Sequence, residues 1–185
     1  MANTKTTGLT ELTAPALSDL LYIVDDPGGT PLSKKITLNN LLALPAGMLY
    51  TRHGVGTQTP GLTYVKITQF DSEGPSQGGV SVSAANNEIT VTDTGLYVAF
   101  LQASFAGSSN STVDMIVFWN GSEVSQAHFS RKLGSGGDIG SASAMGIVDV
   151  TTGNTIFDVR THCDGVSDTV DVDSIQFFVC KIGPT

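Results

Sequence analysis

The chain has 185 residues, with 17 acidic residues against 9 Lys and Arg and a formal net charge of −8. Because phosphate backbones are bound by clusters of Lys and Arg, this balance argues against a nucleic-acid partner. No apolar run reaches the ~18 residues of a membrane span, and no apolar stretch follows the polar N-terminus as in a signal peptide. We therefore expect no membrane insertion, and folding in a cytoplasm.

The first 45 residues form a segment of their own. A strand is predicted over 20–24, the sequence DDPGG at 25–29 is a strong turn signal, and residues 33–36 can pair back as a second strand. Thr37 is a candidate N-cap for one or two helical turns. So small a piece buries too little apolar surface to be stable alone, and we expect it to dock on a partner. The residues predicted to make that contact are Leu20, Leu21, Tyr22, Ile23, Ile36, Leu38, Leu41 and Leu42.

From residue 46 onward the sequence shows only strand signals at short, regular spacing. The longest apolar run, 94–105, places Tyr97, Leu101 and Phe105 on one face at period two, which indicates a strand. Asn120-Gly121 is the dipeptide most typical of a tight hairpin. Further strands are predicted at 48–52, 63–70, 80–83, 88–92, 112–119, 123–129, 141–150, 155–160 and 170–182, with loops at 71–79 and 131–138.

About ten short strands without helices between them cannot make a parallel sheet, because the crossover connections are missing. An antiparallel sandwich, a jelly roll or a barrel remains possible. No repeat of fixed period is present, which excludes propellers and β-helices. The residues expected in the core include Tyr97, Leu101, Phe105, Val117 and Phe177.

Two motifs in the second part of the chain point to a known fold. The pattern I-x-V-x-x-x-G-x-Y runs from Ile89 to Tyr97, and the Asn-Gly hairpin follows at 120–121. Over residues 48–185 the order of these motifs resembles the globular head of the first complement component and the tumour necrosis factor family. The resemblance implies an all-β, antiparallel ten-stranded jelly-roll sandwich over 46–185 that assembles as a tight homotrimer. No Gly-X-Y stalk precedes it, which argues against an immune role.

The first 45 residues resemble something different. DLLYIVDD at 19–26, a glycine turn and KITxxNLL at 35–42 are similar to a short module at the start of tailed-bacteriophage virion proteins, including fibres and head decorations. The two resemblances together predict a homotrimeric capsid decoration or cement protein, made in the host cytoplasm and placed on the capsid exterior. Residues 1–45 would dock on the major capsid protein. The alternatives are a tail-fibre or head-fibre tip that binds a carbohydrate or protein receptor on the host, and a surface binding module with no virion role.

Motifs of enzyme chemistry are nearly absent, so we expect no enzyme. Neither H-E-x-x-H nor G-x-S-x-G occurs, and the glycine-rich stretch 134–137 lacks the lysine and helix of a phosphate loop. His162, Cys163 and Asp164 are neighbours on a strand and therefore point to alternate faces, which cannot form a nucleophile and its base. Cys163 and Cys180 are predicted to be unpaired thiols, and His128 to be a surface or interface side chain.

Four aspartates gather near the end of the chain, Asp164 among them. Calcium prefers several carboxylate and carbonyl oxygens, and heads of the complement type bind calcium near the trimer apex. Asp168, Asp171 and Asp173 are therefore candidate calcium ligands. The favoured interpretation is strand alternation, in which Val170 and Val172 point inward and the aspartates face water. We accordingly expect no metal and no other cofactor.

Overall fold

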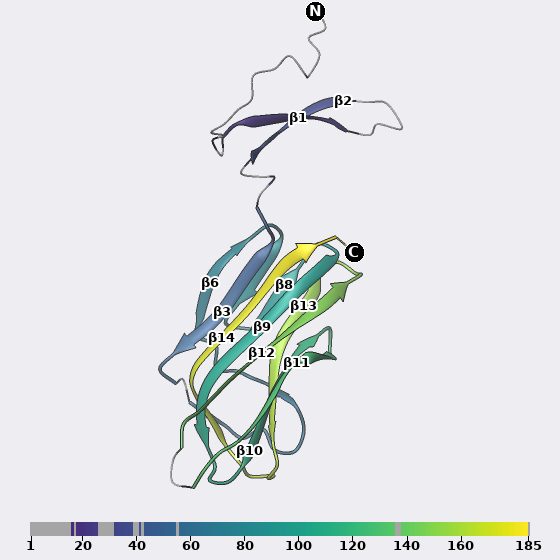
Figure 1. Ribbon diagram of the computed structural model, residues 1–185. Helices are drawn as coiled ribbons and strands as arrows, with labels where there is room; N and C mark the ends of the chain where they lie inside the picture. The colour runs from purple at the N-terminus through teal and green to yellow at the C-terminus, as the bar shows by residue number, and fades with distance from the viewer. Residues whose placement is uncertain are drawn as a thin grey trace, which may run out of the picture. The chain divides into compact units, whose positions relative to one another are not determined.

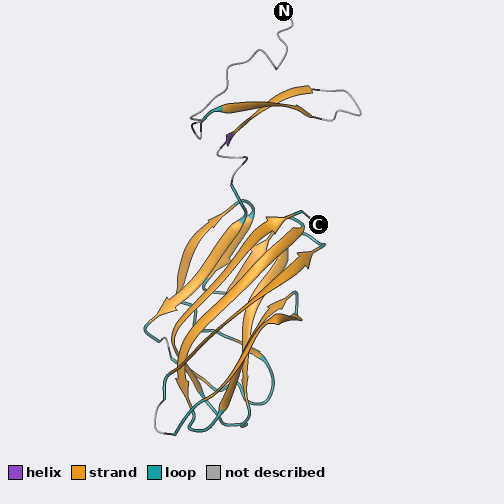
Figure 2. Ribbon diagram, in the orientation of Figure 1, coloured by secondary structure: helices purple, strands orange, loops and turns teal. Residues whose placement is uncertain are grey.

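The computed structural model describes residues 16, 18–25, 32–38, 41, 43–54, 56–135 and 138–184. The chain divides into two units, Met1–Ala43 and Leu44–Thr185. The described residues are almost entirely strand and connecting loop (Figure 2), which confirms the predicted all-β class. Among these residues there is no helix long and apolar enough to cross a membrane.

The smaller unit contains an antiparallel hairpin of β1 (Leu20–Asp25) and β2 (Leu32–Thr37), as the turn signal between them predicts. The backbone amide of Leu38 donates to the carbonyl of Asp19 at 3.0 Å and continues the ladder beyond the last strand pair. In the described part of this unit the sheet has two strands. Two strands have little surface to bury between them, so the hairpin depends on other contacts for its stability.

The larger unit is a sandwich of two antiparallel sheets. The first, here called the β10 sheet, has the strand order β11-β10-β13-β8-β7, and the second, the β9 sheet, has the order β12-β9-β14-β3-β6. Figure 1 shows β14, β9 and β12 side by side in one layer. These two five-stranded paths are the ten strands of the predicted jelly roll. Two strands of two residues, β4 (Thr57–Gln58) and β5 (Val65–Lys66), add to β14 and β13.

The ten principal strands have the following bounds: β3 (Ala46–Arg52), β6 (Ser72–Gln77), β7 (Val80–Ser83), β8 (Glu88–Val91), β9 (Gly95–Gly107), β10 (Thr112–Trp119), β11 (Ser122–Lys132), β12 (Gly140–Val150), β13 (Thr155–Cys163) and β14 (Val170–Gly183).

β9 lies inside its sheet, hydrogen-bonded to β12 on one side and β14 on the other. Its inward side chains, spaced by two residues, are fully buried, and the outward ones are half-buried or exposed. The phenol of Tyr97 donates to the carbonyl of Asp93 at 3.0 Å, which satisfies its polar atom inside the core. All five predicted core residues, Tyr97, Leu101, Phe105, Val117 and Phe177, are fully buried.

The Asn120-Gly121 hairpin joins β10 to β11 as predicted. Both residues have positive φ, 45° and 82°, as the two central positions of a type I′ turn require. The turn is also tied to β13, since the amide of Ile156 donates to the Asn120 side-chain oxygen at 2.9 Å. The turn therefore sets the β10–β11 register as far as Phe118, where a register shift follows, and it also ties the end of β10 to β13.

Two strand predictions were wrong. Only Val65–Lys66 of the predicted strand 63–70 pairs in a sheet, and the predicted loop 71–79 contains the edge strand β6. The rest of this segment is buried in the core without strand pairing: Ile67 and Phe70 are buried, and the Phe70 amide donates to the Asn87 side chain rather than to a ladder. β6 lies at the edge of its sheet and its side chains are half-buried or exposed throughout, so its sequence has no apolar alternation, and its proline is tolerated because one side of an edge strand is unpaired.

Leu101→Ala should destabilise the larger unit by about 2–5 kcal/mol, because it leaves a cavity between fully packed neighbours. Thermal or urea unfolding monitored by circular dichroism measures the loss. Ser125→Ala, at an exposed position of β11, is the matched control and should change stability by less than about 0.5 kcal/mol. A melting temperature unchanged by Leu101→Ala would contradict the packing described above.

Candidate functional site

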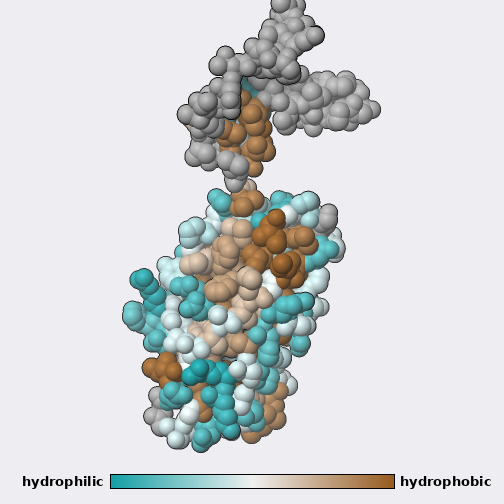
Figure 3. Space-filling model, viewed as in Figure 1, coloured by the Kyte–Doolittle hydropathy of each residue, from teal (hydrophilic) through white to brown (hydrophobic). Residues whose placement is uncertain are grey.

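The outer face of the β9 sheet is apolar over about half its length. The register of β12, β9, β14 and β3 aligns outward side chains in rows that cross the four strands. One row consists of Met145, Phe100, Phe178 and Met48, and the next of Ile147, Val98, Cys180 and Ala46. Met145 and Ile147 are 60% and 55% exposed. This apolar face appears as the brown and tan area on the upper part of the larger unit in Figure 3.

The same face becomes polar toward its other end. The third row consists of Ser143, Gln102, Gln176 and Tyr50, and the fourth of Ser141, Ser104, Ser174 and Arg52. A hollow of about 290 Å³ lies among Gln102, Ser141, Ala142 and Ser143. No charged side chain occurs in the first three rows, and the first, Arg52, comes in the fourth. These three rows thus form an uncharged surface, bounded by Asp149 of β12 beyond the Ile147 row and by Arg52 in the fourth row.

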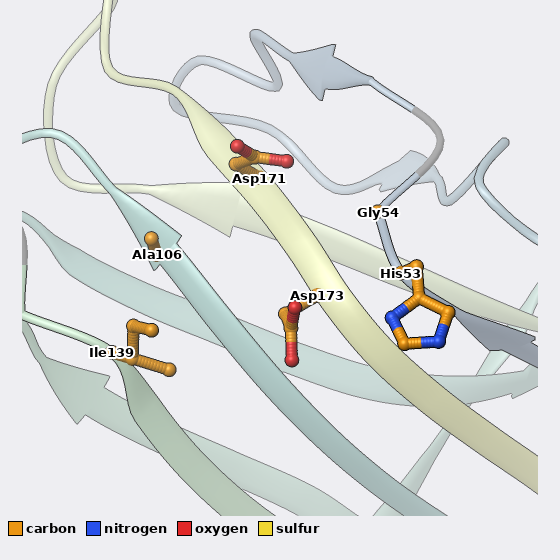
Figure 4. Close-up of a pocket in the computed structure, with 6 residues that line it drawn as sticks. All are labelled: His53, Gly54, Ala106, Ile139, Asp171 and Asp173. Atoms are coloured by element: carbon orange, nitrogen blue, oxygen red, sulfur yellow. The ribbon is translucent and has the colours of Figure 1, made fainter.

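An acidic hollow of about 380 Å³ lies beyond the fourth row (Figure 4). It is lined by His53, Gly54, Ala106, Ile139, Asp171 and Asp173. Figure 4 shows the two carboxylates on β14, with His53 on the chain that follows β3 and Ile139 on the segment before β12. His53 and Ile139 were not predicted for this site, because they come from loops far from the aspartates in sequence.

The three candidate calcium ligands, Asp168, Asp171 and Asp173, do not come together around one point in the structure. Val170 and Val172 are fully buried and the aspartates between and after them are exposed, as alternation predicts. Asp168 does not line the hollow. Across the described residues, no three His, Cys, Asp or Glu side chains are gathered closely enough to hold an ion as they stand.

The predicted docking residues of the smaller unit are partly exposed. Leu20, Leu21 and Leu41 are 46%, 41% and 51% exposed, and Ile36 and Leu38 are half-buried. Tyr22 and Ile23 lie in β1, but their side chains, like the whole of Leu42, are outside the described residues. Leu20 and Leu21 are consecutive on a strand and so point to opposite faces of the hairpin. Both faces of the smaller unit therefore expose leucine.

A polar cluster on the outer face of the β10 sheet was not predicted. Asp114 of β10 lies between two histidines, with Oδ1 2.9 Å from Nε2 of His128 and Oδ2 3.6 Å from Nε2 of His162. The ring of Tyr64 meets the His162 ring edge-on, with centroids 4.5 Å apart. Burial, and then the negative charges of Asp114 and Glu123, raise the pKa of Tyr64. His128 is a surface side chain as predicted, but its partners come from other strands.

Phe118 faces outward on the β10 sheet but is buried, because the side chain of Arg160 covers its ring. The guanidinium of Arg160 lies over the Phe118 ring at 4.1 Å and contacts Asp158 at 2.7 Å. Lys66, carried on β5, reaches Asp158 at 3.9 Å and Glu88 at 3.2 Å. These ion pairs fasten the segment around β5 onto the sheet, a structural role.

The two cysteines are free thiols. Cys163 points into the core while its neighbour His162 points outward, so the two side chains are on opposite faces, as predicted. Burial raises the pKa of both thiols, Cys163 and Cys180. Protonated thiols are weak nucleophiles and weak metal ligands.

Comparison with known proteins supports the fold and no more. The sequence matches no known family model and no curated protein. The structure is similar to murine APRIL at pH 5.0, with a TM-score of 0.51 and 15% identity over 74% of this chain and 99% of that one. It is also similar to murine APRIL at pH 8.5 (TM-score 0.50, 16% identity, 74% and 99% coverage) and to Eiger TNF from S. frugiperda (0.47, 13%, 77% and 94%). The larger unit is therefore a tumour necrosis factor-like jelly roll.

Adding about 10 mM calcium, well above the dissociation constants of ordinary protein calcium sites, should leave the melting temperature unchanged. The reason is that a ligand stabilises the folded state only through a site that binds it, and Asp168 stands apart from Asp171 and Asp173. Differential scanning fluorimetry with magnesium as the ionic-strength control makes the measurement. A rise specific to calcium that Asp171→Asn abolishes would restore the calcium hypothesis.

Proposed function

We propose that this protein is a non-enzymatic structural component of a tailed-phage virion. In this proposal it is a homotrimer that decorates and cements the capsid exterior and docks on the major capsid protein through its N-terminal unit. The observation that carries the proposal is that the two units expose two different apolar surfaces. The jelly roll has a broad uncharged face left open, and the small hairpin unit exposes leucines on both faces.

The trimer is supported by the composition of the β9-sheet face. Two rows of apolar side chains, with Phe100 and Phe178 at the centre, would remain partly in water in a monomer. Around a rotation axis, identical surfaces bring identical residues close together, so like charges near the axis would repel one another. The three uncharged rows, placed nearest the axis, avoid that repulsion. The resemblance to trimeric jelly rolls favours three copies over two.

Light scattering of the purified protein at micromolar concentration should give the mass of a trimer. Phe100→Glu should convert it to monomers, because three carboxylates would be buried without partners in the contact. Ser125→Glu, an equal change of charge on an exposed position of the other sheet, should leave the trimer intact. Circular dichroism should show both variants folded. A wild-type monomer mass would overturn the trimer, and an unaffected Phe100→Glu trimer would place the contact elsewhere.

Capsid docking is supported by the size and surface of the smaller unit. A two-stranded hairpin has too little apolar surface for stability in isolation, yet its exposed leucines make it too apolar for a solvated tail. Docking on another protein resolves both difficulties. Three linked copies would raise avidity even where each contact is weak, and the negative charge of the chain would discourage stray binding to packaged DNA.

Deletion of residues 1–44 should leave a folded trimer that no longer decorates bare capsids, as measured by co-sedimentation. In the full-length chain, Leu20→Asp with Leu41→Asp should have the same effect, and Leu62→Asp, at an exposed position of the larger unit, should not. Capsid binding that survives both changes would contradict the proposed docking. If the truncated trimer instead binds whole host cells and the full-length protein blocks infection, the receptor-binding fibre tip replaces the cement protein.

A further inference from the structure

We propose that Tyr50, in the third row of the β9-sheet face, fills the hollow beside Gln102 and Ser143 of the neighbouring copy in the trimer. The hollow is formed by residues of β9 and β12, and Tyr50 lies on β3, at the other side of the same sheet. This inference rests on the trimer proposed above and goes beyond it by naming the residues that fit one copy to the next.

The order of the rows decides how the copies face one another. Along the strands, the two apolar rows are followed by the uncharged polar third row, and the charged residues Asp149 and Arg52 bound the three rows at either end. Apolar side chains are stabilised by contact with apolar side chains, so each row must meet the same row of the next copy. A threefold axis that runs along the strands brings like rows together. An axis across the strands would set apolar rows against polar ones.

Around an axis along the strands, opposite sides of the sheet come together. A cyclic trimer has a head-to-tail contact, in which two different parts of the surface meet in every pair of copies. In the order β12-β9-β14-β3, these two parts are the β12 side and the β3 side, and Figure 1 shows them on either side of β9 and β14. Each row therefore places its β12 residue beside the β3 residue of the same row in the next copy.

Side-chain sizes are complementary across that contact. In the second row the large residue, Ile147, is on β12 and the small residue, Ala46, is on β3. In the third row the order is reversed, with Ser143 on β12 and Tyr50 on β3. The first row has a methionine at each side, and methionine adapts to irregular gaps. Large side chains therefore face small ones in the two rows where size is fixed.

The hollow at the small end of the third row suits a phenol. It measures about 290 Å³, which leaves room for an aromatic side chain, and its lining of Gln102, Ser141, Ala142 and Ser143 is uncharged. Serine hydroxyls and a glutamine amide both donate and accept hydrogen bonds, so they can pair with a tyrosine hydroxyl. Within the described part of the chain, the Tyr50 hydroxyl bonds to no other residue.

Tyr50 cannot fill the hollow of its own chain. The strands β14 and β9 separate β3 from β12, and three strand spacings of about 4.8 Å put the two sides about 14 Å apart. Beyond β3, the edge strand β6 pairs only a serine, Ser72, with Tyr50, so Tyr50 is the largest side chain at this side of the row. A tyrosine that enters the hollow therefore comes from another copy.

The test exchanges the sizes of the two residues in the full-length protein and measures trimer dissociation by analytical ultracentrifugation over a concentration series. Ser143→Tyr blocks the hollow and Tyr50→Ala leaves it empty, and each should raise the dissociation midpoint by about tenfold or more, as loss of a central tyrosine contact does. Tyr50→Phe keeps the ring and should have a smaller effect than Tyr50→Ala. Ser143→Tyr combined with Tyr50→Ser returns one tyrosine to each contact and should assemble better than Ser143→Tyr alone.

Ser125→Tyr, the same change at an exposed position of β11, is the matched control and should leave the trimer unchanged. Circular dichroism should show every variant folded, because the substituted side chains face outward. A wild-type monomer would overturn the trimer and this contact with it. A wild-type trimer that neither Ser143→Tyr nor Tyr50→Ala weakens would overturn the Tyr50 contact alone. A double variant that assembles no better than Ser143→Tyr would also overturn it, because the two positions then do not meet.

Discussion

Alternation of side chains along β9 is the constraint on which the larger unit depends. A strand inside a sandwich sheet has one face in the core, so every second residue must be apolar, and Tyr97, Leu101 and Phe105 fill that role. The same parity sends Val98, Phe100 and Gln102 to the opposite face. A shift of one residue would exchange the two sets. The rows on the outer face are therefore a consequence of how the core is filled.

The parts of the fold governed by local rules were predictable from sequence. Period two located the core strands, and the Asn120-Gly121 turn located a hairpin, because each signal lies within a few residues. β6 was missed because its side chains are half-buried or exposed, so its sequence shows no apolar alternation. It is a strand because its backbone pairs with β3, a residue-independent contact that the local sequence does not reveal. Residues 63–70 misled for the opposite reason. Beyond the short strand Val65–Lys66, the apolar spacing there reflects burial in the core, where the Phe70 ring lies 6.3 Å from that of Phe177.

The candidate sites were less predictable, because each is assembled from strands and loops distant in sequence. Asp114 meets His162 through the β10–β13 ladder, and the register shift between Ile116 and Phe118 decides how far His128 lies from Asp114. No local pattern encodes that shift. The aspartates of β14 were visible as a cluster, yet their partners in the hollow, His53 and Ile139, come from other loops. The sequence therefore pointed to the aspartates, but not to the residues that lie beside them in the fold.

Alternation of side chains along β1 also limits which partners can stabilise the hairpin unit. Leu20 and Leu21 are neighbours on β1, and both are exposed, so the apolar contacts of the hairpin face two directions. A flat surface can cover only one face of a two-stranded sheet. The other leucine would stay in water, and the hairpin would keep much of the instability that an isolated pair of strands has. A partner that stabilises it must enclose both faces, as a groove in one subunit or the seam between two subunits does. For a capsid protein, this favours attachment where subunits meet, which is also where a cement protein would hold neighbouring subunits together.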